Sequence, residues 1–109
     1  MVTITPRPSL LTLINSFDVD PSRCDELLAL LVEATDTTMR HLDGFISASF
    51  HRSLDNRHIA NYAQWTNKQA FDAMLNDPNA QVHMKAAAKL AISFSPILYY
   101  VVHVDERSR

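Results

Sequence analysis

Residues 45–65 read FISASFHRSLDNRHIANYAQW, and this segment predicts a β-hairpin. Apolar and polar side chains alternate over 45–52 and again over 58–66, as is typical of half-buried strands. Asp55-Asn56, between the two runs, fits the central positions of a tight turn. The register that follows pairs Phe50 with Asn61, Ala48 with Ala63, Ile46 with Trp65, Ser49 with Tyr62, Ser47 with Gln64 and His51 with Ala60.

The sequence on either side of the hairpin predicts helices and two further strands. Asp20-Pro21 has the N-cap and first-turn residues of a helix, and Thr66 to Gln69 resembles a capping box. Apolar residues recur every three or four positions after Asp20-Pro21, and Asn76-Asp77-Pro78 interrupts the later helical segment. The predicted elements are strands at 10–19, 45–52, 58–66 and 95–104, and helices at 20–40, 66–75 and 79–90.

This β-α-β-β-α-β order predicts an α+β, ferredoxin-like fold. Right-handed crossovers give a four-stranded antiparallel sheet with the helices on one face and the first and third strands as neighbours. The 109 residues form a single domain, with an N-terminal arm at 1–8 and a C-terminal tail at 105–109. The other sheet face would carry Ile14, Tyr62, Tyr100, Val102 or their neighbours. That face is too apolar for water, so we expect it to be buried in a homodimer, a dimeric α+β barrel.

Composition excludes several classes of function. Ten Lys and Arg against twelve Asp and Glu give a net charge of −2, which offers no basic surface for nucleic acid or for a membrane. The single cysteine, Cys24, cannot form an intramolecular disulfide or a cysteine-based zinc site. Neither a signal peptide nor a spanning apolar run is recognisable, so a cytoplasmic protein is expected. Gly44 is the only glycine, too few for a phosphate-binding loop.

Two asparagines and a tryptophan stand where core residues are expected. Asn15 shares a strand face with Leu11, Leu13 and Phe17, and Asn61 shares one with Trp65. Because these strands are predicted neighbours, both carboxamides and the indole could converge in one cavity. Either backbone groups satisfy each buried Asn, or the carboxamides await a ligand. An indole wall with directional carboxamides suits a planar, oxygenated aromatic molecule.

The histidines suggest a metal site less strongly. His51 and His58 are diagonal neighbours on one hairpin face, close enough to share an ion. A third protein ligand is not evident in the sequence, and a pair of solvated histidines at the sheet rim is the simpler interpretation. No metal is therefore predicted.

Residues 42–78, LDGFISASFHRSLDNRHIANYAQWTNKQAFDAMLNDP, resemble the antibiotic biosynthesis monooxygenase (ABM) family. The features that carry the likeness are Asp43-Gly44-Phe45, the hairpin, and N-Y-A-Q-W before a capped helix with Ala70-Phe71. In pattern the likeness extends from about Leu11 to Val104. The resemblance implies small ferredoxin-like homodimers with a cavity between sheet and helices.

The most similar members of that family are cofactor-independent monooxygenases that oxidise anthrone-type polyketides to quinones with O2. The resemblance implies catalytic roles for Asn15, Asn61 and Trp65. We expect substrate contacts from Phe50, Phe71, Leu75 and His51. Some relatives also have a Tyr and an Arg in the pocket. The corresponding positions in this chain are Phe71 and residues 84–86, so the resemblance does not carry over acid–base assistance by these two residues.

Two alternatives stay open at this point. A haem-degrading branch of the family uses an Asn, a Trp and a helix His about ten residues after the Trp. Here that position is Leu75, and His83 lies further along, which disfavours the haem branch. The other alternative is a non-catalytic ferredoxin-like binding dimer, whose pocket would be filled by its own side chains.

Overall fold

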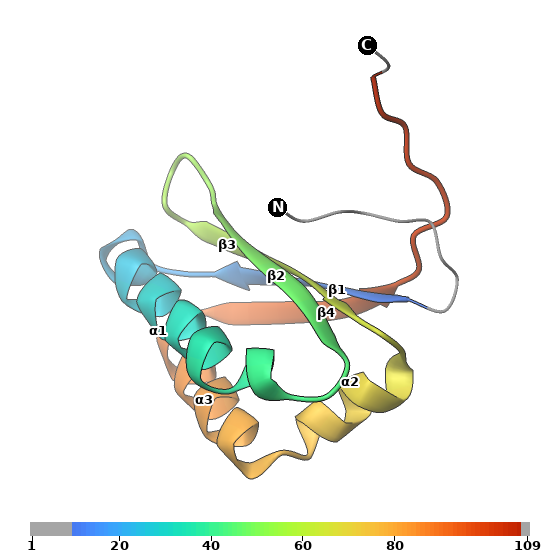
Figure 1. The fold of residues 1–109 in the computed structure, drawn as a ribbon. Coiled ribbons are helices and arrows are strands. Elements are labelled where there is room, and N and C mark those ends of the chain that lie inside the picture. The colour runs from blue at the N-terminus through green and yellow to red at the C-terminus, as the bar shows by residue number, and fades with distance from the viewer. Residues whose placement is uncertain (1–9, 108–109) are drawn as a thin grey trace.

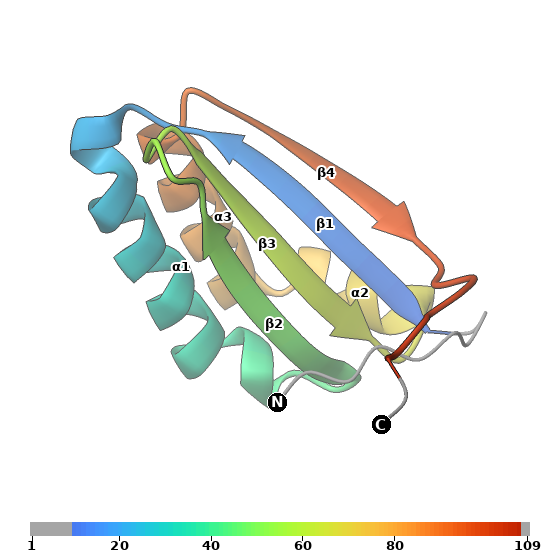
Figure 2. The same ribbon diagram turned by 90° about the horizontal axis from the view of Figure 1, so that it is seen from above.

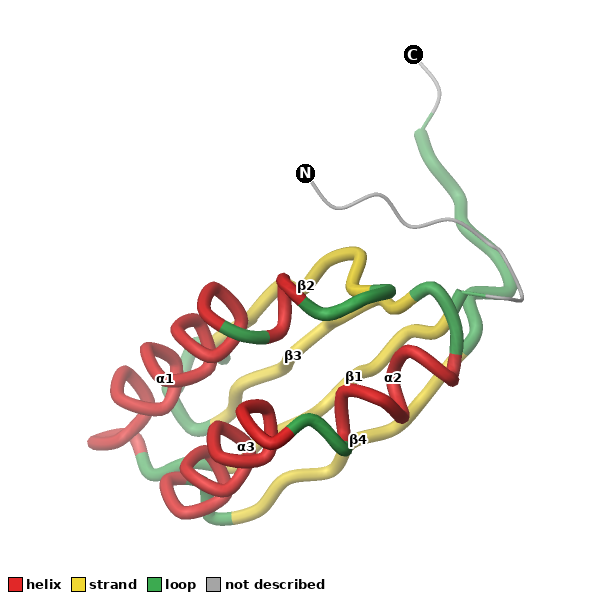
Figure 3. Tube along the Cα trace, turned by 60° about the horizontal axis from the view of Figure 1, so that its bottom comes forward, coloured by secondary structure: helices red, strands yellow, loops and turns green. Residues whose placement is uncertain are grey.

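The predicted ferredoxin-like architecture is confirmed by the computed structural model, which describes residues 10–107. Four antiparallel strands lie in the order β2-β3-β1-β4, and three helices cover one face of this sheet (Figure 1, Figure 2). Figure 3 shows all three helices in front of the sheet, and the C-terminal end of the described chain extends on the side away from the helices (Figure 1). The elements are β1 (Leu11–Asp18), α1 (Cys24–Thr37), β2 (Phe45–Arg52), β3 (His58–Trp65), α2 (Lys68–Leu75), α3 (Pro78–Leu90) and β4 (Ser93–Tyr99).

Several predicted boundaries were wrong, each for a local reason. β4 begins at Ser93 and ends at Tyr99, because its ladder with β1 runs from Asp18↔Ser93 to Thr12↔Tyr99. Residues 100–107 have no regular secondary structure, so the strand predicted to Val104 stops early. The predicted arm at 1–8 and the last two tail residues lie outside the described residues.

The helix boundaries differ by one turn or less. Two 3-10 turns, Pro21–Arg23 and Met39–His41, flank α1, where a single helix over 20–40 was predicted. The N-cap of α2 is Asn67, whose side chain accepts from the Ala70 N–H at 2.8 Å. Thr66 was the predicted cap, but its own N–H donates to the Gly44 carbonyl and belongs to the junction with β2.

The predicted hairpin register is confirmed except at its open end. Phe45, not Ile46, pairs with Trp65, because a β-bulge shifts the register between Phe45 and Ser47. Ile46 is consequently 43% exposed. The turn also differs from the prediction: the Asn56 N–H donates to the Ser53 carbonyl, so the turn spans Ser53 to Asn56 and Asn56 takes a left-handed φ of 61°.

The buried core is divided into two clusters under the helices. One gathers around Trp65, Phe71 and Met74, and the other around Phe17, Leu27 and Ile59. None of the helices within residues 10–107 has the length and apolar composition needed to cross a membrane.

Gly44 forms the junction between β2, β3 and α2. Its carbonyl accepts from the Thr66 N–H at 2.8 Å, and its φ is +85°, a conformation that L side chains rarely adopt. A methyl group on its Cα would collide with the Ala70 Cβ on α2 and lie 2.7 Å from Thr66 Oγ1. The only glycine in the chain is therefore required both by its backbone conformation and by its neighbours.

Gly44→Ala is expected to lower the free energy of unfolding by at least about 1–2 kcal/mol, the usual penalty for a left-handed non-glycine residue. The collision with Ala70 adds to that penalty. Urea unfolding of Gly44→Ala, Ala70→Gly and the double variant measures both parts. The double variant should lose less than the two single losses summed, and strict additivity would contradict the proposed collision.

Candidate functional site

A cavity of about 390 Å³ lies between the inner face of the sheet and the helices. This volume falls within the range of small-molecule sites. Members of both core clusters line it, so the cavity occupies the space that separates them. Its lining comprises Leu13, Asn15, Phe17, Leu31, Ala34, Thr35, Met39, Phe45, Ala48, Phe50, Asn61, Ala63, Trp65, Phe71, Met74, Leu75, His83, Met84, Ala87, Ala88, Phe94, Pro96 and Leu98.

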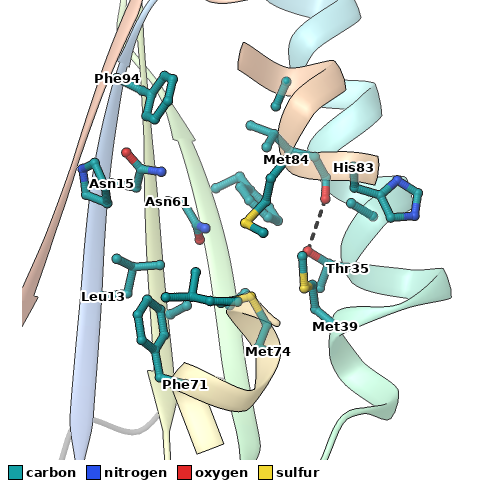
Figure 4. A pocket seen from close by; sticks show the side chains of 18 of the residues that line it. Leu13, Asn15, Thr35, Met39, Asn61, Phe71, Met74, His83, Met84 and Phe94 are labelled. Atoms are coloured by element: carbon teal, nitrogen blue, oxygen red, sulfur yellow. Dashed lines mark hydrogen bonds between the residues drawn. The ribbon is translucent and has the colours of Figure 1, made fainter. Parts of the chain in front are cut away.

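Asn15 and Asn61 face each other across the two central strands, and both line the cavity (Figure 4). The Oδ1 atoms of both residues are buried, and neither has a hydrogen-bond partner among the described residues. An unpartnered buried polar group costs about 1–3 kcal/mol. The sequence left open whether backbone groups would satisfy these carboxamides, and no group within residues 10–107 bonds to either oxygen.

Trp65 closes the cavity at the end of β3. It is only 2% exposed, and its ring makes edge-on contacts with Phe45 at 5.4 Å and with Phe71 at 6.3 Å between centroids. Such T-shaped pairs hold an aromatic side chain in a defined orientation. The bulge that brings Phe45 opposite Trp65 therefore also fixes the plane of the indole.

Three of the four predicted substrate-binding residues, Phe50, Phe71 and Leu75, line the cavity. The fourth, His51, does not. It pairs with Ala60 on the opposite face of the sheet, where its Nε2 lies 3.0 Å from Ser49 Oγ. Assigning His51 to substrate binding was wrong because alternation along β2 places it on the face away from Phe50.

The histidine pair of the hairpin does not form a shared ion site. His58 Nδ1 lies 2.7 Å from Asp18 Oδ1, whereas His51 contacts Ser49. Hydrogen bonds from the Ser93 hydroxyl and from His58 lower the pKa of Asp18 below its ordinary value. Asp18, His58 and Ser93 thus connect the ends of β1, β3 and β4. Among residues 10–107, no three His, Cys, Asp or Glu side chains are placed to hold a metal ion.

The cavity is nearly free of ionisable groups. Within the described residues its lining contains no Asp, Glu, Lys, Arg, Tyr or Cys, and His83 is the one titratable side chain. His83 Nε2 lies 3.1 Å from Thr38 Oγ1, and its ring points away from the two asparagines (Figure 4). On the same wall, Thr35 Oγ1 donates to the Leu31 carbonyl at 3.0 Å. Directional polarity in the cavity is therefore concentrated on the sheet side.

Sequence reasoning missed part of the lining. Phe94, Pro96 and Leu98 come from the inner face of β4, and the alternation of that strand was a usable signal. Thr35 and three methionines come from the helical wall. The apolar periodicity of a helix indicates which residues face the core, but it does not distinguish those that line a cavity from those that pack against other side chains. The cavity itself is open and apolar, which argues against a pocket filled by the protein's own side chains.

The family comparison agrees with this geometry. The model of the antibiotic biosynthesis monooxygenase family matches residues 10–88. The chain belongs to this family. Tetracenomycin-F1 monooxygenase of Streptomyces glaucescens is 42% identical to this ABM protein over 103 residues, covering 94% of this chain and 91% of the relative.

Solved structures of two oxygenases share the fold. A monooxygenase from the gene ActVA-Orf6 of Streptomyces coelicolor, solved with nanaomycin D, superimposes with a TM-score of 0.83 at 26% identity, covering 95% of this chain and 96% of that chain. SnoaB, a cofactor-independent oxygenase from Streptomyces nogalater, has a TM-score of 0.74 at 21% identity, covering 88% of this chain and 96% of that chain.

Removing the Asn61 carboxamide should not destabilise this ABM domain. Asn61→Ala deletes a buried oxygen without a partner, so its melting temperature is expected to stay unchanged or rise. Gln64→Ala is the matched control on the other face of β3. Gln64 is 1% exposed and its Nε2 donates to Thr12 Oγ1, so its loss should cost about 1–3 kcal/mol. Thermal unfolding would contradict the interpretation of Asn61 if both variants lost stability equally.

Proposed function

We propose that this ABM protein is a cofactor-independent monooxygenase that oxidises a polycyclic, anthrone- or phenol-type polyketide with O2, giving a quinone. The observation that carries the proposal is the Asn15–Asn61 pair, whose unpartnered oxygens lie in a mostly apolar cavity. Each carboxamide offers an acceptor oxygen and two donor hydrogens. The pair can therefore accept from a phenolic hydroxyl and donate to a ring oxygen of a flat aromatic molecule.

Stabilisation of the substrate anion is the proposed role of the two asparagines. An anthrone is a carbon acid, and loss of its proton places negative charge on the ring oxygens. Hydrogen bonds from Nδ2 groups to those oxygens favour the anion over the neutral form, which is how differential binding accelerates a reaction. Trp65 would hold the plane of the rings and exclude water.

The oxidising equivalents come from O2 and the electrons from the substrate. The anion passes one electron to O2, and recombination of the two radicals with a proton gives a hydroperoxide at the former methylene carbon. Loss of water leaves the carbonyl of the quinone. In the overall reaction one CH2 group and one O2 become one C=O group and one H2O, so these steps need no redox cofactor.

Similarity to known enzymes supports the substrate class. Tetracenomycin-F1 monooxygenase is related to this chain at 42% identity over nearly its whole length. The ActVA-Orf6 monooxygenase was solved with nanaomycin D, and the fold match extends over 95% of this chain. Both relatives favour a fused-ring substrate in the cavity beside Asn61.

Oxygen-uptake measurements with anthrones, naphthols and quinols test the function. We expect one O2 consumed per quinone formed and no turnover under anaerobic conditions. Quinone formation that continues without O2 would contradict the proposal. Haemin titration tests the haem alternative, which predicts a Soret shift at stoichiometric haemin.

Asn61→Ala is expected to lower kcat by about 10²-fold or more, the range for removing one oxyanion donor. Asn15→Ala should act in the same direction, because the two side chains face each other. Steady-state oxygen uptake gives kcat and KM for each variant. Gln64→Ala, on the far face of β3, is the control for loss of fold. Wild-type kcat in a folded Asn61→Ala protein would remove Asn61 from the catalytic residues.

We also propose that a second copy of the chain covers the outer face of the sheet. In the structure β4 contributes Ile97 and Tyr99 to that face, 49% and 43% exposed, instead of the expected Tyr100 and Val102. Ile97 pairs with Ile14, so the apolar surface continues onto β1. A homodimer mass by light scattering is expected, and Ile97→Lys should shift the mass to the monomer. A monomeric wild-type protein would contradict this proposal.

The cytoplasmic location of the enzyme stays a prediction.

A further inference from the structure

Three of the four methionines in the chain line the cavity between the sheet and the helices. They come from three different elements: Met39 from the 3-10 turn after α1, Met74 from α2 and Met84 from α3. Figure 4 shows Met84 reaching from α3 toward Asn61. A thioether is a polarisable nucleophile that an apolar filler such as leucine cannot replace chemically.

The three sulfurs differ in their surroundings. Met74 is 6% exposed and packs within the cluster around Trp65 and Phe71. Met39 belongs to the helical wall beside Thr35 (Figure 4). Met84 is partly buried and extends toward the asparagine pair, where the proposed substrate anion would be held. In Figure 4, Met84 is the thioether that extends from α3 toward Asn61.

We propose that Met84 is a site of turnover-dependent oxidation to methionine sulfoxide, with the aromatic hydroperoxide of the substrate as the oxidant. This inference rests on the proposed function, because the hydroperoxide is the intermediate of that reaction. The cavity holds thioether and peroxide together, and such confinement greatly raises the effective concentration of a reacting pair.

The oxidation step balances without any further reagent. A lone pair of the Met84 sulfur attacks the terminal peroxide oxygen, the S–O bond forms, and the O–O bond breaks. The hydroxyl proton moves to the departing alkoxide, so the hydroperoxide is reduced to an alcohol while the sulfur is oxidised by two electrons. This step competes with loss of water, which gives the quinone. Each Met84 oxidation therefore yields one hydroxylated product in place of one quinone.

Oxidation would change the cavity that produced it. A sulfoxide places a polar, chiral S=O group in a wall built mostly from apolar side chains. The flat ring system would then meet an unpaired acceptor opposite the asparagines. Activity should therefore decline with the number of turnovers, and it should return on treatment with a methionine sulfoxide reductase, the class of enzyme that reverses this modification.

Turnover under 18O2 followed by peptide mass spectrometry tests the proposal. The Met84 peptide should gain one 18O atom, about 18 Da, at a level at least about fivefold above the Met39 and Met74 peptides. Enzyme incubated with the quinone product and 18O2 is the control and should gain none. Quinone formation with an unlabelled Met84 would overturn the inference and leave the proposed function standing. Absence of any quinone would instead count against the proposed function.

A second arm does not depend on turnover. Cumene hydroperoxide, added to the resting enzyme without O2, should oxidise Met84 before Met39 and Met74. Equal oxidation of the three, or Met84 oxidised last, would overturn the inference even if the native substrate is misassigned.

Met84→Leu is the matched variant, because this exchange nearly conserves volume and removes the sulfur. For each protein we divide the number of turnovers completed before inactivation by the initial rate. This ratio should be at least about twofold higher for Met84→Leu than for the wild-type protein, and Met39→Leu should not show the increase. Equal lifetimes of Met84→Leu and the wild-type protein would mean that Met84 only fills space.

Discussion

The pairing of β1 with β3 is the constraint on which the rest of the molecule depends. It sets Asn15 opposite Asn61, Leu13 opposite Ala63 and Leu11 opposite Trp65 at the centre of the sheet. Side chains alternate between faces, so a slip of one residue in either strand would turn its asparagine toward the outer surface. The helices would then cover polar residues such as Thr12 or Gln64 instead of a cavity.

The site exists because the core is incomplete between its two clusters. Trp65 and its neighbours pack at one end and Leu27 with Ile59 at the other, and each cluster is well buried. The space between them contains two carboxamide oxygens for which the described part of the chain offers no hydrogen-bond partner. Both groups cost folding free energy, and a ligand that satisfies them recovers it. Stability of this fold and affinity for its ligand are thus coupled through the same two atoms.

The polar centre of the site could be predicted from the sequence, because side-chain alternation and the order of the strands follow from the residue pattern. Alternation and strand order predict Asn15, Asn61 and Trp65 on one inner face, and the structure places them there. Ile46 was misplaced because a bulge adds one residue without a signature of its own. His51 was expected to contact substrate although the predicted register already paired it with Ala60, on the face opposite to Phe50, and the structure keeps that pairing. The end of β4 was not predictable from its own residues, since the limit was set by where its partner β1 begins.

Both edges of the sheet carry features that oppose open-ended association. β4 forms one edge and contains Pro96, which has no backbone N–H to offer to an added strand. β2 forms the other edge, and its bulge between Phe45 and Ser47 interrupts the regular spacing of its hydrogen-bonding groups. Growth by strand addition, the geometry of fibres, is therefore disfavoured at each side. An α+β protein with an apolar sheet face is in this way directed toward closed, finite assemblies and away from aggregates.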